Sequence, residues 1–243
     1  MIKSQFFFDV LFSYGIRFYT GVPDSLLKNI CFYIASHTTQ SDHIIAANEG
    51  NALSIGIGYH LATGKIPLIY MQNSGLGNVV NPLMSLADSE VYSIPMLLMI
   101  GWRGEPNVKD EPQHVKQGRI MLQTLDAMEI PYSIIDGSSE SQALDSLERA
   151  KSYFSEHNAP YAIIIKKGSF ENYNLKLKAE TFFDLSREKA IETILEHSKG
   201  NDIFVSTTGM PSRELFELRE TRDDGHSNDF LTVGLSSNVS GNK

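Results

Sequence analysis

The amino-acid sequence predicts an α/β fold, with a parallel sheet covered by helices on both faces. Short apolar runs alternate with segments of helical periodicity along the first two thirds of the chain. The run 95–100 is apolar at nearly every position, as expected for a strand covered on both sides. Short loops join the segments, and strands that alternate with helices in this way are typical of a three-layer, parallel architecture.

The composition is that of an ordinary globular protein. The chain has 243 residues, 42% hydrophobic and 21% charged, with a formal net charge of -8. No basic stripe is present, so we expect no nucleic-acid partner. No apolar run approaches the ~18 residues of a membrane span, so we expect no membrane contact. The single cysteine, Cys31, can form no internal disulfide, and the histidines show no zinc-site spacing. These features favour a cytoplasmic protein.

Strand–helix units can be placed along residues 1–167, which we expect to form the first domain. The stretch 43–64 supplies a short buried strand, then Glu49, then a helix in which we expect Gly56 and Gly58 to pack closely against another backbone. The other expected elements are, in order, helix 3–14, strand 16–19, helix 25–36, strand 66–71, helix 78–88, strand 95–100, helix 114–128, strand 132–135, helix 139–157 and strand 161–166.

The pattern lapses over 168–185, which we interpret as a linker. A second α/β unit is expected over 186–243, beginning with a helix that Ser186 can cap. Its expected elements are helix 187–198, strand 203–206, helix 212–219 and a strand that starts at Phe230. So few elements bury little apolar area, and the unit therefore reads as the unfinished beginning of a domain.

Polar side chains follow four of the expected strands, at the edge where open α/β sheets bind ligands. They are Asp24 and Ser25, then Asn48 and Glu49, then Asn73, Ser74 and Asn78, and finally the polar loop 101–114. Each also has a plain structural explanation, because Asp, Asn and Ser are good helix caps and turn residues, and a glutamate is favourable at a helix N-terminus. Their common position at one sheet edge favours a shared site.

Several familiar motifs are missing. The pairs Gly56–Gly58 and Gly75–Gly77 lack the third glycine of a dinucleotide fingerprint, and the sequence contains neither a P-loop nor a hydrolase elbow. His114 has the side chain that titrates nearest neutral pH and is a candidate general acid, although a solvated loop histidine explains it equally well. The acidic and basic residues at 109–111 could belong to a functional site, but a charge cluster exposed to solvent explains them equally well.

Five motifs carry a resemblance to a known family. They are Gly21–Ser25, Asn48–Gly50, Asn73–Asn78, Gly101–Gly104 and Asp110–His114. The sequence containing them resembles the thiamine-diphosphate-dependent phosphonopyruvate and sulfopyruvate decarboxylase family. The likeness extends over about residues 1–234, and the motifs at 207–209 and 230–234 look like the opening of that family's second domain. The resemblance implies that 1–167 is the domain that holds the aminopyrimidine ring.

The resemblance also implies roles for individual residues. Glu49 matches the activating glutamate, which hydrogen-bonds to the aminopyrimidine ring of thiamine diphosphate. The cofactor pocket is expected to be lined by Glu49, Asn73, Ser74, Gly75 and Asn78. Proton relay is expected from Asp24 and His114, and substrate contact from Ser25, Gln113, Arg103 and Lys109. For Arg103 and Lys109 a salt bridge is an equally good explanation.

The activity implied is the decarboxylation of 3-phosphonopyruvate to phosphonoacetaldehyde and CO₂, on the route to 2-aminoethylphosphonate. The family further implies a homo-oligomer with active sites between subunits and a Mg²⁺ ion that bridges the cofactor diphosphate. Sulfopyruvate, another three-carbon 2-keto acid with an anionic terminus, is the alternative substrate. The sequence does not separate a phosphonate from a sulfonate.

One departure from the family concerns the metal. The Gly-Asp-Gly motif that binds Mg²⁺ in the second domain does not occur, and Asp223–Gly225 is the nearest string. The tail after Gly234 no longer resembles the family. We therefore expect a truncated chain, or a subunit completed by another chain, whose metal ligands lie elsewhere. A non-catalytic remnant is the alternative that this departure leaves open.

Overall fold

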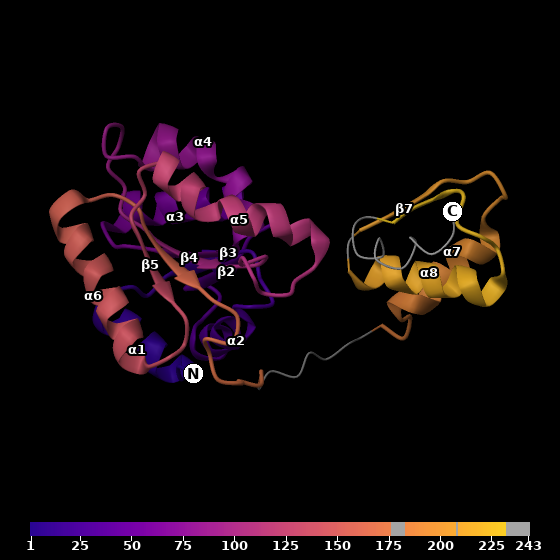
Figure 1. The fold of residues 1–243 in the computed structure, drawn as a ribbon, viewed down its shortest axis with the longest axis horizontal. Coiled ribbons are helices and arrows are strands. Elements are labelled where there is room, and N and C mark those ends of the chain that lie inside the picture. The colour runs from indigo at the N-terminus through magenta and orange to yellow at the C-terminus, as the bar shows by residue number, and fades with distance from the viewer. Residues whose placement is uncertain (176–182, 208, 232–243) are drawn as a thin grey trace. The chain divides into compact units, whose positions relative to one another are not determined.

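The computed structural model describes residues 1–175, 183–207 and 209–231. The chain divides into two compact units, Met1–Lys178 and Ala179–Lys243, and each is described by itself (Figure 1). Within the described ranges, no helix is both long and apolar enough to span a bilayer.

The first unit is built on one sheet of six parallel strands, as the sequence predicts. Its strands are β1 (Tyr19–Gly21), β2 (His43–Ile45), β3 (Leu68–Gln72), β4 (Leu97–Gly101), β5 (Tyr132–Ile135) and β6 (Tyr161–Ile165). Their spatial order is β2-β1-β3-β4-β6-β5. The order reverses between β1 and β3, so the loops that follow these two strands lead to opposite faces of the sheet. Such a reversal is where open α/β sheets bind ligands.

Helices cover both faces of this sheet (Figure 1). The helices are α1 (Ser4–Ser13), α2 (Lys28–His37), α3 (Glu49–Thr63), α4 (Val80–Pro82), α5 (Pro112–Ala127) and α6 (Glu140–His157). A 3₁₀ helix (Asn73–Asn78) precedes α4, and a π-helical segment (Leu83–Ala87) follows it. One face carries α1, α2 and α6, and the other carries α3, α4 and α5.

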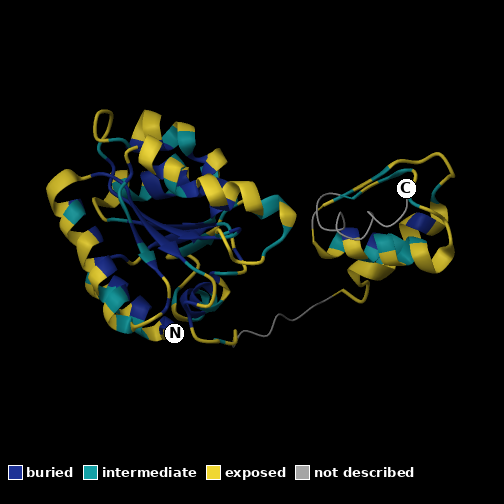
Figure 2. Ribbon diagram, viewed as in Figure 1, coloured by how far each residue is buried: buried dark blue, intermediate teal, exposed yellow. Residues whose placement is uncertain are grey.

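The central strands supply side chains to both cores. In β3, Leu68 and Tyr70 belong to the cluster beneath α1, α2 and α6, while Ile69 and Met71 belong to the opposite cluster. The same alternation divides β4, as expected when successive side chains of a strand point to opposite faces. Figure 2 shows the result: the central strands are buried and the outer helix surfaces are exposed. The near-continuous apolar run of β4 is thereby explained.

The structure corrects four details of the sequence interpretation. The first strand lies at Tyr19–Gly21 and not at 16–19, because the residues that pair with both neighbouring strands are Tyr19, Thr20 and Gly21. The second strand is not buried: it lies at the edge of the sheet, and Ile45 is 63% exposed. Helix α2 begins three residues late, at Lys28. Gly56 packs against side chains of Ile69 and Pro67 rather than against backbone, and no heavy atom lies within 4 Å of a Cβ placed at Gly58.

Residues 168–175, expected to belong to the linker, pack on the first unit. Ile2 and Phe170 form a parallel bridge, and Phe170 is buried against the ring of Phe7. Tyr173 contacts Tyr33 of α2. The apolar side chains of this segment thus complete the core beneath α1 and α2. The part of the expected linker at 176–182 lies outside the described residues.

The second unit contains α7 (Arg187–His197), β7 (Phe204–Ser206), α8 (Met210–Arg222) and β8 (Asp229–Leu231). Ser186 caps α7, as predicted, by accepting a hydrogen bond from the Lys189 backbone N–H. The strands β7 and β8 pair in parallel, and the paired residues Val205 and Phe230 are 73% and 64% exposed. The expected motif at 232–234 and the tail beyond it lie outside the described residues.

Leu98, the second residue of β4, provides a test of the first unit's core. Replacing it by alanine is expected to lower the free energy of unfolding by about 2–5 kcal/mol, because the side chain is fully buried and leaves a cavity. The fluorescence of Trp102, the single tryptophan of the chain, reports this unit during urea unfolding. Leu61→Ala is the matched control, because Leu61 is 69% exposed, and should change stability by less than ~0.5 kcal/mol. Equal effects of the two substitutions would contradict the assigned core.

Candidate functional site

The carboxyl ends of β3 and β4 are joined by one buried side chain. Gln72 and Gly101 are paired at the ends of these strands. Immediately afterwards, the Asn73 side chain accepts a hydrogen bond from the Arg103 N–H (3.0 Å) and donates one to the Arg103 carbonyl (2.8 Å). Asn73 is 4% exposed, so this pair of bonds extends the ladder between the two strands into their loops. Its amide was expected to line a cofactor pocket, and both of its polar atoms are used in this contact.

Glu49 lies at the beginning of α3, where its carboxylate reaches away from its own helix. The helix is capped by Asn48, which accepts a hydrogen bond from the Asn51 N–H. The carboxylate of Glu49 accepts a hydrogen bond from Asn78 Nδ2 at 2.7 Å. A Cβ at Gly75 would overlap the Glu49 side chain, so the 3₁₀ helix after β3 passes directly against this carboxylate. The side chain therefore connects the loops that follow β2 and β3.

Asp24 follows β1 and is 6% exposed. One oxygen, Oδ2, accepts a hydrogen bond from the Leu26 N–H and lies where a Cβ of Gly101 would be. Burial raises the pKa of Asp24, although backbone N–H groups and the charge of Arg103 oppose this effect. Its other oxygen, Oδ1, is buried and has no hydrogen-bond partner among the described residues. It is an acceptor available to a ligand.

Arg103 is held in place by neighbouring side chains. Its guanidinium donates two hydrogen bonds to Asp110, through Nε (2.8 Å) and Nη2 (2.5 Å), and a third to Ser25 Oγ (2.9 Å). Asp110 also accepts from the Gly104 and Glu111 backbone N–H groups. The hydrogen bond from Arg103 lowers the pKa of Asp110 well below its usual range. In this structure Arg103 therefore forms a salt bridge with Asp110, the alternative that the sequence left open for it.

Two further contacts fix the loop that contains Arg103. Trp102 Nε1 donates a hydrogen bond to the Gly118 carbonyl in α5, at 2.8 Å. Glu105 forms an ion pair with Lys166, which follows β6. A Cβ at Gly118 would overlap the Gly104 backbone, so helix and loop are in direct contact. The loop is therefore a well-anchored part of the sheet edge.

His114 lies in the first turns of α5, next to the end of β3. Its Nδ1 is 3.3 Å from Gln72 Nε2, and the same Gln72 nitrogen donates to Ser74 Oγ. Burial, assisted by the positive charge of Arg103, lowers the pKa of His114, so the neutral imidazole predominates at neutral pH. Beside it, Gln113 Oε1 is buried and unpartnered within the described part of the chain.

The structure brings nearly all of the sequence-predicted site residues to one edge of the sheet. They are Asp24, Ser25, Glu49, Asn73, Ser74, Gly75, Asn78, Arg103, Gln113 and His114. Lys109 is exposed and forms no hydrogen bond or ion pair with the described residues. Sequence reasoning did not single out Gln72 or assign a role to Asp110. The sequence offered one indication of the role of Asp110, its position in the same loop as Arg103.

The site residues fit the pyrimidine half of thiamine diphosphate. The site offers a carboxylate at Glu49, pressed against glycine backbone, and two unpartnered buried oxygens at Asp24 and Gln113. A heteroaromatic ring with an amino group can donate to such acceptors. Metal binding is a different matter: the described residues contain no cluster of three or more His, Cys, Asp or Glu side chains able to hold a metal ion.

Asp110→Asn tests how the loop is anchored. The substitution is expected to lower the free energy of unfolding by about 1–2 kcal/mol near neutral pH, because Arg103 loses its charged acceptor. Since the pKa of Asp110 is depressed in the folded state, its contribution is complete above about pH 4 and is lost as the pH falls below that value. The stability difference should shrink on acidification. A difference independent of pH, or an equal loss in Asp145→Asn on the exposed face of α6, would contradict the anchor.

Gly75→Ala tests the position of the Glu49 carboxylate. The new methyl group should displace the flexible Glu49 side chain and break its bond with Asn78, while the backbone keeps its course. The expected observation is a change in the side-chain amide resonances of Asn78 in NMR spectra, with little loss of stability. Gly77→Ala is the matched control in the same 3₁₀ helix, because a Cβ there meets no atom within 4 Å. Unchanged Asn78 signals in Gly75→Ala would contradict this geometry.

Comparisons with known proteins show the family of this chain. The family "Thiamine pyrophosphate enzyme, N-terminal TPP binding domain" matches residues 1–130. A phosphonopyruvate decarboxylase of Streptomyces viridochromogenes is 29% identical over 91% of this chain and 59% of its own length. A sulfopyruvate decarboxylase subunit alpha of Methanocaldococcus jannaschii is 33% identical over 68% of this chain and 93% of its own.

Solved structures show the same fold. A putative thiamin diphosphate-dependent enzyme from Mycobacterium smegmatis superposes with a TM-score of 0.52 at 14% identity, over 84% of this chain and 39% of that one. The chain spans about three fifths of the phosphonopyruvate decarboxylase that it matches. The resemblance predicted from the motifs is confirmed: this chain belongs to the thiamine pyrophosphate enzyme family, in the branch that contains the phosphonopyruvate and sulfopyruvate decarboxylases.

Proposed function

We propose that this chain acts in the thiamine-diphosphate-dependent decarboxylation of 3-phosphonopyruvate to phosphonoacetaldehyde and CO₂. The observation that carries the proposal is the Glu49 carboxylate, which lies against Gly75 and accepts from Asn78 at the carboxyl edge of the sheet. The relative with the matching activity in its name extends over 91% of the chain.

In this proposal the residues of the first unit position and polarise the cofactor. When bound, thiamine diphosphate supplies the electron sink that the loss of CO₂ requires. Glu49 would hold the aminopyrimidine ring through a hydrogen bond to a ring nitrogen, and Asn78 would keep its carboxylate oriented. Ser74 and the backbone of Gly75 would border the ring. The diphosphate and its Mg²⁺ would be held by residues outside the first unit.

The proposed proton-transfer and substrate roles belong to other residues at the same edge of the sheet. Asp24, whose pKa is raised by burial, can hold a proton near neutral pH more readily than an exposed aspartate. His114 is predominantly neutral and can accept one. Ser25 and Gln113 would contact the substrate. Because Arg103 is already bound by Asp110, it would meet the phosphonate only through its remaining N–H groups, and Lys109 would do so only after its exposed side chain turns inward.

Sulfopyruvate is the second candidate substrate. It is favoured by one observation: the relative named as subunit alpha of a sulfopyruvate decarboxylase has higher identity, 33%, and is covered over 93% of its length. That name also supports an assembly of this chain with other subunits. Both acids carry the anionic terminus that the polar edge of the sheet would accept.

Glu49→Gln tests the proposed role of the carboxylate. We expect CO₂ release from 3-phosphonopyruvate, in the presence of thiamine diphosphate and Mg²⁺, to fall by at least ~100-fold, because an amide cannot share a proton with the ring. The fold should persist, and Glu90→Gln, at an exposed position in the loop after the π-helical segment, should retain full activity. The assay measures turnover of both acids by the same preparation.

The outcomes separate the alternatives. Faster turnover of sulfopyruvate than of 3-phosphonopyruvate would overturn the substrate assignment and leave the reaction class intact. A twofold effect of Glu49→Gln would contradict the role of that carboxylate. Failure to bind thiamine diphosphate in calorimetry, with no turnover of either acid even after a chain carrying the second domain is added, would contradict the enzymatic function and support a non-catalytic chain. Binding and turnover that appear only with that added chain would support a subunit completed by another chain.

A further inference from the structure

A cavity lies at the opposite edge of the same sheet, where the strands begin. It has a volume of about 220 Å³ and is bordered by residues at or before the amino ends of three strands: Ile16 precedes β1, Ile66 precedes β3, and Leu97 begins β4. The candidate active site lies where these strands end. The two places therefore share the sheet and have no residue in common.

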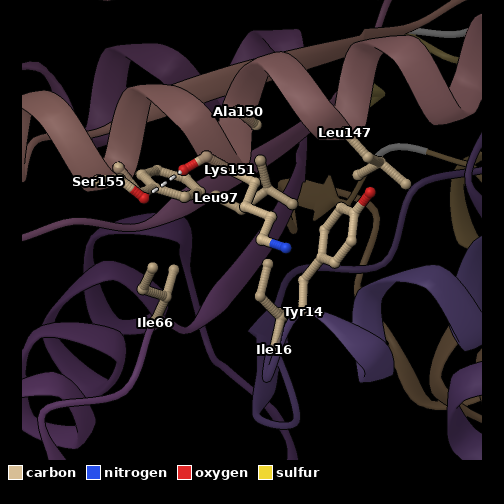
Figure 3. A pocket seen from close by; sticks show the side chains of 9 residues that line it. Tyr14, Ile16, Ile66, Leu97, Leu147, Ala150, Lys151 and Ser155 are labelled. Carbon is tan, nitrogen blue, oxygen red and sulfur yellow. Dashed lines mark hydrogen bonds between the residues drawn. The ribbon is translucent and has the colours of Figure 1, made fainter.

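The walls of this cavity are apolar. Besides the three residues at the strand ends, Leu147, Ala150 and Phe154 of α6 line it (Figure 3). An apolar cavity of about 150 Å³ is large enough to hold a benzene molecule in other proteins. A volume of about 220 Å³ therefore suits a small aromatic or branched aliphatic group, with room for a head group.

The polar side chains that line the cavity are Tyr14, Lys151 and Ser155. Lys151 extends across it toward Tyr14 and Ile16, and its Nζ lies 4.5 Å from the centre of the Tyr14 ring (Figure 3). The lysines that form ion pairs in the described part of the chain are Lys166 and Lys189, and Lys151 is not among them. A cation–π contact leaves the N–H donors of an ammonium free for an anion.

Tyr14 adds a neutral donor to this cation. Burial, together with the negative charge of Glu148, raises the pKa of Tyr14, so its phenol stays protonated and can donate a hydrogen bond. Glu148 is exposed and is the carboxylate that acts on this phenol. Ser155 is the remaining polar side chain, and its hydroxyl donates to the Lys151 carbonyl within α6.

We propose that this cavity binds a small monocarboxylate with an apolar body, with the body between α6 and the strand ends and the carboxylate at Lys151 and Tyr14. One ammonium and one phenol match a single carboxylate in charge and in hydrogen-bond donors. The apolar walls select an aromatic or branched aliphatic body over the small, highly charged acid proposed for the carboxyl edge. The inference rests on the cavity alone and does not depend on the proposed decarboxylase function.

Benzoate is a suitable probe, with benzyl alcohol as its neutral counterpart of similar shape. In methyl NMR spectra of the whole chain, benzoate should produce saturable shifts of the Ile16, Leu97 and Leu147 signals. Lys151→Met keeps the apolar stem and removes the charge, and it should weaken benzoate binding roughly fivefold, the effect of about 1 kcal/mol. Arg149→Met, on the same helix but outside the cavity, removes an equal charge and should leave the affinity unchanged.

The binding of benzyl alcohol completes the test. It should be weaker than that of benzoate in the unmodified chain and equal in the unmodified chain and Lys151→Met. Absence of saturable shifts at the three methyl-bearing residues would overturn the site. Equal affinities for benzoate and benzyl alcohol, or an unchanged benzoate affinity in Lys151→Met, would overturn the choice of a carboxylate ligand.

Discussion

The candidate site depends on the pair of hydrogen bonds between the Asn73 side chain and the Arg103 backbone. Strands β3 and β4 pair through Gln72 and Gly101, and without a further connection the loops would separate there. The Asn73 side chain bonds to the N–H and the carbonyl of Arg103, as a neighbouring strand would, and so keeps the two loops together beyond the ends of the strands. On one side of this connection Gly75 lies against Glu49, and on the other Arg103 reaches Ser25. Loops from four strands, β1 to β4, are thereby held at one edge with little freedom.

The architecture could be predicted because it depends on patterns that the sequence carries locally. The strand at 132–135 has β-branched and aromatic residues between Pro131 and Asp136, so both of its ends are marked. The first strand was misplaced because its end depends on pairing: Gly21, which has low strand propensity, becomes a strand residue through its partners in β2 and β3. The exposure of β2 likewise depends on strand order, which single-sequence periodicity does not contain.

The residues that lie at the site could be predicted from the sequence, but their contacts with one another could not. A polar residue at a strand end can be read from the chain, and Glu49 and Asp24 were identified in that way. The partner of a side chain depends on which loops meet in space. Asp110 could equally have been a solvated charge, and only the folded loop brings its carboxylate onto the Arg103 guanidinium and the Gly104 N–H. Asn73 lies at the expected edge of the sheet, and its bonding partner there, the Arg103 backbone, could not be read from the sequence.

Strand β4 connects the two ends of the first unit. Leu97, its first residue, borders the apolar cavity, while Gly101, its last, lies against Asp24. An extended strand rises ~3.3 Å per residue and cannot shorten without losing its ladder, so this spacing is fixed at about 13 Å. The strand thus acts as a rigid spacer in the middle of the sheet. A displacement at one end can reach the other only as a movement of the whole strand, together with the neighbours that are hydrogen-bonded to it.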